Sequence, residues 1–105
     1  MAWKVKLSVD AQADLRDIAS WLTQRGAGAE AAQKLAALKA GLQGLRLDPL
    51  RHPEFEPTGG RKCSTRGGYE IHYDVTPDPA RSTTSGVVEV LFVKSPFQDY
   101  STLIP

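Results

Sequence analysis

The sequence predicts an α+β domain in which a helical hairpin covers one face of a mostly antiparallel sheet. Two short segments, 3–9 and 69–75, alternate apolar and polar residues, which is the period of a strand with one buried face. Between them, two stretches place apolar residues at helical spacing. The order strand, helix, helix and then three strands favours an α+β fold over an all-helical core.

Length and composition predict one globular domain over residues 1–105. The chain has 105 residues, of which 41% are hydrophobic and 24% charged, and its net charge is +1. It has no run of about 18 apolar residues, and Lys4 and Lys6 interrupt the apolar start, so we expect neither a membrane span nor a secretory signal. A single cysteine cannot form an internal disulfide, and this favours a cytoplasmic location.

The first predicted strand, 3–9, leads into a helix within 11–24. Asp10 is the expected N-cap, and Asp14 and Asp17 place negative charge in the first turns, where the helix dipole favours it. The apolar stripe of this helix consists of Ala11, Leu15, Ile18 and Leu22. Trp3 and Trp21 occupy positions that are expected to pack in the core.

A second helix is predicted over about 29–45. Its apolar stripe consists of Leu35, Leu38, Leu42 and Leu45. Gly41 and Gly44 either weaken its last turns or permit close packing. Asp48-Pro49 ends the helical structure, and a polar stretch that contains proline continues to Gly60.

The rest of the chain is predicted to form three strands, at about 61–64, 69–75 and 87–94, with a long hairpin loop over 76–86. The last strand is nearly all apolar, which is typical of a central strand covered on both faces.

The strand 69–75 separates its residues onto two faces. Its apolar face, formed by Tyr69, Ile71, Tyr73 and Val75, is expected to pack under the helices. Glu70 and His72 then share the opposite face, with their Cβ atoms roughly 6–7 Å apart. A carboxylate and an imidazole at that distance could act as base and acid in RNA cleavage through the 2′-hydroxyl. The alternative is an ordinary solvated strand face.

Basic residues lie beside this strand in the sequence. Arg61, Lys62 and Arg66 precede it, and Lys94 closes the last strand. Antiparallel pairing is expected to bring several of these charges to one end of the sheet, where a phosphate backbone or an acidic peptide could bind. A solvated charged face without a ligand is again the alternative.

Several kinds of site are not expected. The sequence contains no glycine-rich phosphate loop and no His or Cys pair at metal-ligand spacing, so we expect no cofactor and no metal. Cys63 has no nucleophile motif around it and is interpreted as a small strand residue. The helices carry leucine stripes instead of a basic recognition surface, so we expect no sequence-specific DNA binding by this chain alone.

Taken together, these segments resemble the RelE/ParE toxin superfamily over nearly the whole chain. The resemblance rests on LSVDAQADLRDIASWL, a leucine-striped second helix that ends in DP, GGRKCSTRGGYEIHYDV and VVEVLFVKSPFQDY, in this order. It is closer to the ParE branch, whose first helix reads A-x-x-D-L-x-x-I and which has an R-R/K-C segment before the third strand. Ala11, Asp14, Leu15 and Ile18 match the helix, and Arg61, Lys62 and Cys63 match the segment.

This resemblance implies a toxin that a cognate antitoxin, encoded nearby, neutralises. ParE-like members inhibit DNA gyrase without hydrolytic chemistry, whereas RelE-like members cut messenger RNA on the ribosome. The RelE branch has arginines after the strand tyrosine and after the last strand, but here these positions hold Glu70 and the segment from Lys94 to Pro96.

We therefore expect a gyrase inhibitor whose target and antitoxin bind Arg61, Lys62, Arg66 and Lys94. The alternatives are a ribosome-dependent ribonuclease that uses Glu70, His72 and Tyr100, and an inactive member that only binds its antitoxin.

Overall fold

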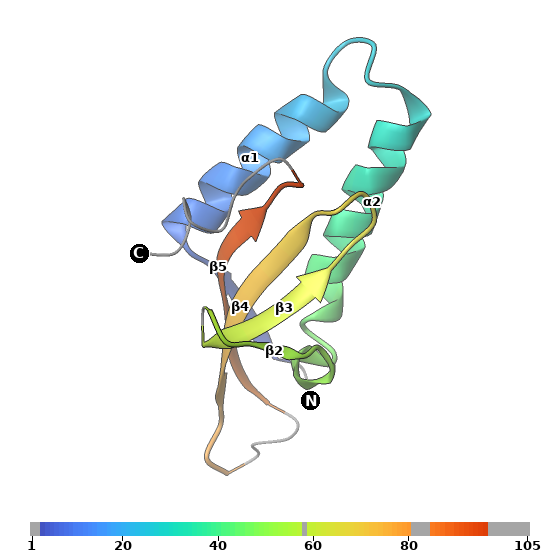
Figure 1. Cartoon of the computed structure of the whole chain (residues 1–105). Coiled ribbons are helices and arrows are strands. Elements are labelled where there is room, and N and C mark those ends of the chain that lie inside the picture. Colours follow the sequence, from blue (N-terminus) through green and yellow to red (C-terminus); the bar gives the residue numbers. More distant parts are fainter. Residues whose placement is uncertain (1–2, 58, 81–84, 97–105) are drawn as a thin grey trace.

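The computed structural model describes residues 3–57, 59–80 and 85–96. Within them the helices are α1 (Val9–Thr23), α2 (Gly28–Gly44) and the short 3₁₀ helix η1 (Pro49–Arg51), and the strands are β1 (Lys4–Leu7), β2 (Glu54–Phe55), β3 (Gly60–Ser64), β4 (Glu70–Pro77) and β5 (Gly86–Lys94). The two long helices form a hairpin behind the sheet (Figure 1). The predicted α+β class and element order are confirmed.

The number of strands in the sheet differs from the prediction, which was a three-stranded sheet after a separate N-terminal strand. The described strands form one mixed sheet in the order β1-β5-β4-β3-β2. β1 joins it by parallel pairing with β5, from Lys4 opposite Val87 to Leu7 opposite Val90. The prediction missed β2 because two residues in a stretch that contains proline are too short for an alternating pattern.

The N-cap of helix α1 lies two residues before the predicted one, Asp10, and the helix begins at Val9. Ser8 is the N-cap, and its hydroxyl accepts a hydrogen bond from the backbone N–H of Ala11 (3.0 Å). The same hydroxyl donates to the carbonyl of Leu91 (2.7 Å). The Ser8 side chain therefore caps α1 and also links the junction between β1 and α1 to β5. Asp10 lies in the first helical turn, where its charge still suits the helix dipole.

Helix α2 packs closely on β3 and β4 through Gly41. A Cβ atom at this position would lie 3.0 Å from Thr65 Cγ2 and 3.2 Å from Ile71 Cδ1, so a larger residue would push the helix away from the sheet. Gly44 faces open space and shows no such requirement. Of the two alternatives for these glycines, Gly41 therefore serves close packing.

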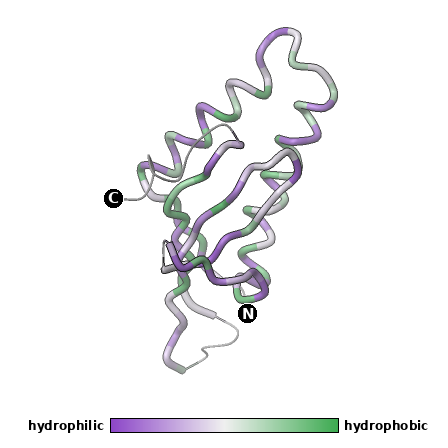
Figure 2. Tube along the Cα trace, in the orientation of Figure 1, coloured by the Kyte–Doolittle hydropathy of each residue, from purple (hydrophilic) through white to green (hydrophobic). Residues whose placement is uncertain are grey.

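The core lies between the helical hairpin and the sheet. Its fully buried members include Leu38, Leu45, Ile71, Val88 and Val90. Strand β5 contributes Val88, Val90 and Val93 to the sheet side of the core, and its tube is largely hydrophobic in Figure 2. It is a central strand, as predicted, although Glu89 on its outer face is exposed.

A β-bulge decides which β5 side chains face the helices. His72 pairs with Phe92 while Tyr73 pairs with Val90, so Leu91 is the additional residue. Without it, the alternation that buries Val88 and Val90 would turn Phe92 toward the helices and Val93 toward the outer face. The bulge instead buries Val93 under the helices and leaves Phe92 on the outer face beside His72.

Candidate functional site

The outer face of the sheet carries Glu70 and His72, as the alternation predicted, but the imidazole is not solvated. The side chain of His72 is 0% exposed. It stacks on Phe92, with ring centroids 4.5 Å apart, and the ring of Phe55 lies 5.1 Å away at a tilt. The solvated strand face that stood as the alternative is therefore wrong for His72.

Glu70 connects this histidine to the basic residues. Its Oε1 lies 3.2 Å from His72 Nε2, and its Oε2 lies 3.8 Å from the Nζ of Lys62. The ammonium of Lys62 also lies 4.8 Å from the centroid of the Phe55 ring, a cation–π distance. Burial lowers the pKa of His72, and this effect outweighs the opposing attraction of Glu70. Burial therefore favours the neutral form of this histidine.

The four predicted basic residues do not form one patch. Lys62 and Lys94 lie on the strands on either side of Glu70, and Lys94 is buried, with its Nζ donating to the carbonyl of Ser95 (3.2 Å). Arg61 points to the other side and donates to the carbonyls of Leu50 (3.2 Å) and His52 (2.6 Å). Pairing therefore brings together two of the four charges. Tyr100 lies outside the described residues.

Arg66 lies in the turn between β3 and β4, beside α2. Gly67 and Gly68 both have a positive φ there, at +88° and +86°, a conformation that other residues rarely adopt. This explains the Gly-Gly pair in the sequence. The guanidinium of Arg66 lies 3.2 Å from Glu30 on α2, and both side chains are more than half exposed. Such an exposed pair leaves Arg66 available to a partner.

Arg61 and Arg66 give a matched test of these two environments. Arg61→Ala removes two charged hydrogen bonds to main-chain carbonyls, which should cost about 2 kcal/mol and lower the Tm by roughly 8 °C or more. Arg66→Ala removes only an exposed ion pair, so its cost should stay below about 1 kcal/mol. Thermal denaturation of both variants measures the difference, and equal Tm values would contradict the structural role of Arg61.

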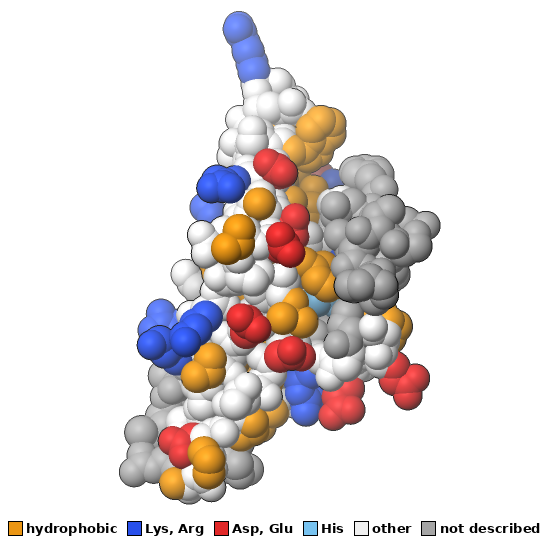
Figure 3. Space-filling view, turned by 90° about the vertical axis from the view of Figure 1, so that its left-hand side faces the viewer, with side chains coloured by type: hydrophobic (Ala, Val, Ile, Leu, Met, Phe, Trp, Pro, Cys, Tyr) orange, Lys and Arg blue, Asp and Glu red, His pale blue; other side chains and the backbone are white. Residues whose placement is uncertain are grey.

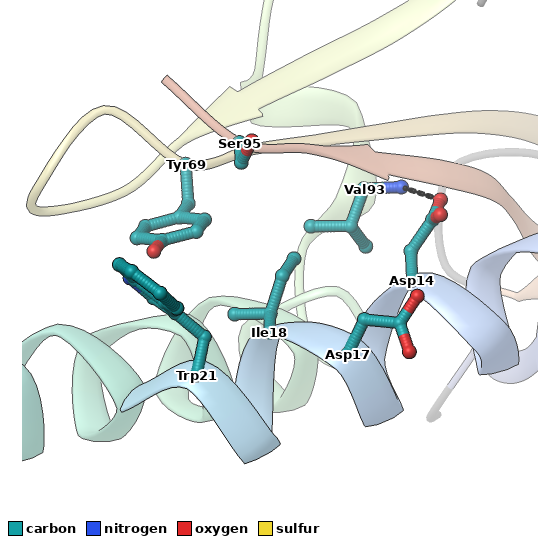
Figure 4. Close-up of a pocket in the computed structure, with 7 residues that line it drawn as sticks. All are labelled: Asp14, Asp17, Ile18, Trp21, Tyr69, Val93 and Ser95. Carbon is teal, nitrogen blue, oxygen red and sulfur yellow. Dashed lines mark hydrogen bonds between the residues drawn. The ribbon is translucent and has the colours of Figure 1, made fainter. Parts of the chain in front are cut away.

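The structure also contains a groove that the sequence did not predict. It has a volume of about 320 Å³ and lies between α1 and the ends of the β strands; it is lined by Asp14, Asp17, Ile18, Trp21, Tyr69, Val93 and Ser95. We call it the α1 groove (Figure 4). Trp21, which was expected to pack in the core, is instead 58% exposed at this groove. In the sequence, the spacing of Asp14, Ile18 and Trp21 places them on one face of the helix. This spacing was the signal that these α1 residues could line a groove together.

The side chain of Asp14 lies at the edge of β5, in the place that β1 would take if it continued past Leu7. β1 ends opposite Val90, and among the described residues no other strand pairs with the edge of β5 beyond that point. The carboxylate of Asp14 accepts the hydrogen bond of the Val93 N–H (3.0 Å), as Figure 4 shows. Burial is the main cause that raises the pKa of Asp14, and the nearby charges of Asp10 and Asp17 raise it further.

The face around α1 carries acidic and apolar side chains along its middle and basic side chains along one edge. Figure 3, which looks at this side of the molecule, shows red acidic side chains interleaved with orange hydrophobic ones down its middle. Within the described ranges, no three His, Cys, Asp or Glu side chains are grouped so that they could hold a metal ion. In the same part of the chain, no helix is long and apolar enough to cross a membrane.

A helical hairpin on one face of a five-stranded mixed sheet, with a buried core between them, defines a small α+β protein. The family model for the ParE toxin of the type II toxin–antitoxin system parDE matches residues 5–99. The chain therefore belongs to the ParE toxin family, and it is the toxin component of such a system. Among curated proteins, none matches the chain significantly.

Proposed function

We propose that this toxin arrests growth by binding DNA gyrase, without hydrolysing RNA, and that its cognate antitoxin neutralises it. One observation supports binding over hydrolysis. The pair that could act as acid and base, Glu70 and His72, includes an imidazole with no exposed surface, packed between Phe55 and Phe92. A general acid must come within hydrogen-bond reach of the group that it protonates, and a side chain buried in this way does not reach a phosphodiester.

Lys62 and Arg66 are the basic residues that we propose for partner contacts. The side chain of Lys62 is 27% exposed and that of Arg66 is 55% exposed, and each is paired with a single carboxylate. An acidic segment of the antitoxin or of the target could compete for these cations. Lys94 and Arg61 would contribute less, because their cationic groups donate to main-chain carbonyls of the chain itself.

The ribonuclease alternative has one observation in its favour. Glu70 Oε1 lies 3.2 Å from His72 Nε2, which is a hydrogen-bond distance for an acid–base pair. For this function the aromatic cover over His72 would have to open on the ribosome. Catalysis would then depend on both side chains.

Expression in bacteria separates the two functions. We expect the chain alone to arrest growth and to relax reporter plasmids, and co-expression of the antitoxin should restore both growth and supercoiling. Primer extension on messenger RNA from the same cells should give no new stops. New cleavage sites within codons, with plasmid supercoiling unchanged, would contradict the gyrase proposal and favour the ribonuclease.

A further inference from the structure

The α1 groove combines an exposed aromatic residue with a buried apolar floor. Trp21 is 58% exposed, whereas Ile18, Tyr69 and Val93 beneath and beside it are almost fully buried. Figure 4 places Trp21 and Tyr69 at one end of the groove and Asp14 and Asp17 at the other. Trp and Tyr are enriched among the residues that carry most of the binding energy of protein interfaces. The apolar end therefore fits an apolar side chain of a partner.

The acidic end of the groove is not neutralised by the described part of the chain. Asp10, Asp14 and Asp17 all lie on α1, and none of them takes part in an ion pair there. Asp14 uses one carboxylate oxygen for the Val93 N–H, so its other oxygen can still accept a hydrogen bond. Burial is the main cause of the raised pKa of Asp14, and repulsion from Asp10 and Asp17 adds to it.

We propose that the α1 groove binds a segment of the antitoxin that places an arginine or lysine against Asp14 and Asp17 and an apolar side chain against Trp21. This inference rests on the proposed function insofar as the antitoxin is the partner. The α1 groove is a different surface from the one that carries Lys62 and Arg66. We propose that the groove binds a basic segment, whereas Lys62 and Arg66 would bind an acidic one.

Charge complementarity favours a basic segment of the antitoxin in the α1 groove. A cation in the groove would relieve the repulsion among the α1 carboxylates and would form charged hydrogen bonds with them, the stronger class of hydrogen bond. Its alkyl stem could lie along the Trp21 ring, since lysine and arginine bury their methylene groups against apolar surfaces. An acidic segment would meet only repulsion here. The two surfaces together would therefore fix the direction in which the antitoxin crosses the toxin.

The test compares Asp17→Asn and Trp21→Ala with the control Asp10→Asn. Asp10 lies on the same helix and has the same charge, but it is not part of the groove lining. We expect Asp17→Asn and Trp21→Ala each to weaken binding of the purified full-length antitoxin by about tenfold or more in calorimetry at low salt, the loss of one charged or hot-spot contact. Asp10→Asn should change the affinity by less than about threefold, because an exposed charge that does not contact the partner contributes little to binding.

Two results would overturn the proposal. One is an unchanged affinity for both groove variants, or an equal loss for Asp10→Asn, which would reduce the effect to general electrostatics. The other is a self-associated toxin that Asp17→Asn converts to a monomer, since the groove would then bind a second copy of this chain. Gyrase inhibition by the wild-type toxin is measured separately. Its absence would refute the proposed target while leaving the antitoxin result valid.

Discussion

Replacing His72 with alanine is expected to cause the largest loss of stability of any single substitution on the sheet's outer face. The imidazole is fully buried, stacks on Phe92 at 4.5 Å and contacts Phe55. Alanine would leave a cavity between two aromatic rings, which costs about 3 kcal/mol for a large buried side chain. Urea denaturation at neutral pH should show this loss, together with a Tm lower by roughly 12 °C or more.

His72 should also make stability depend on pH. Its pKa is lower in the folded chain than the ordinary value of 6.5, because burial disfavours the charged form. The unfolded chain therefore binds a proton more readily, and the stability that this histidine contributes is complete above pH 6.5 and is lost as the pH falls through the folded pKa. His72→Phe is the matched control, since it keeps a stacked ring without titration. An equal acid sensitivity of wild type and His72→Phe would contradict this role.

Glu70→Gln is expected to leave growth arrest intact. If Glu70 were the general base of a ribonuclease, its loss would reduce the rate by about 10²–10⁴-fold. In the binding function, Glu70 only positions His72 and Lys62, and glutamine keeps the shape and much of the hydrogen bonding. Viable counts after induction should therefore fall as far for Glu70→Gln as for the wild type. Recovery of growth with a correctly folded variant would mean that the carboxylate does chemistry.

Much of the fold could be predicted from the sequence, because the patterns of the long elements are strong. The alternation in 69–75 correctly placed Tyr69, Ile71 and Tyr73 under the helices. The β-bulge at Leu91 and the N-cap at Ser8 could not be predicted, because each depends on a contact with a distant strand. Asp10 is as good a capping residue as Ser8 by local chemistry, and only the bond from Ser8 to β5 decides between them.

The candidate site was predicted less well, for a related reason. Alternation placed Glu70 and His72 on one face, but the rings that bury His72 come from β2 and β5. The sequence also grouped Arg61 with Lys62, although neighbouring residues in a strand point to opposite faces. Trp21 looked like a core residue because its helix is amphipathic, and its exposure depends on how α1 lies over the edge of β5.

The most direct test of the gyrase proposal is a supercoiling assay with purified components. Relaxed plasmid, gyrase and ATP are incubated with increasing amounts of the toxin, with and without an excess of the antitoxin. We predict that the toxin inhibits supercoiling in proportion to its concentration, that Glu70→Gln inhibits equally, and that the antitoxin restores activity. Full supercoiling in the presence of excess folded toxin, combined with messenger RNA cleavage by ribosomes that contain it, would contradict the proposal.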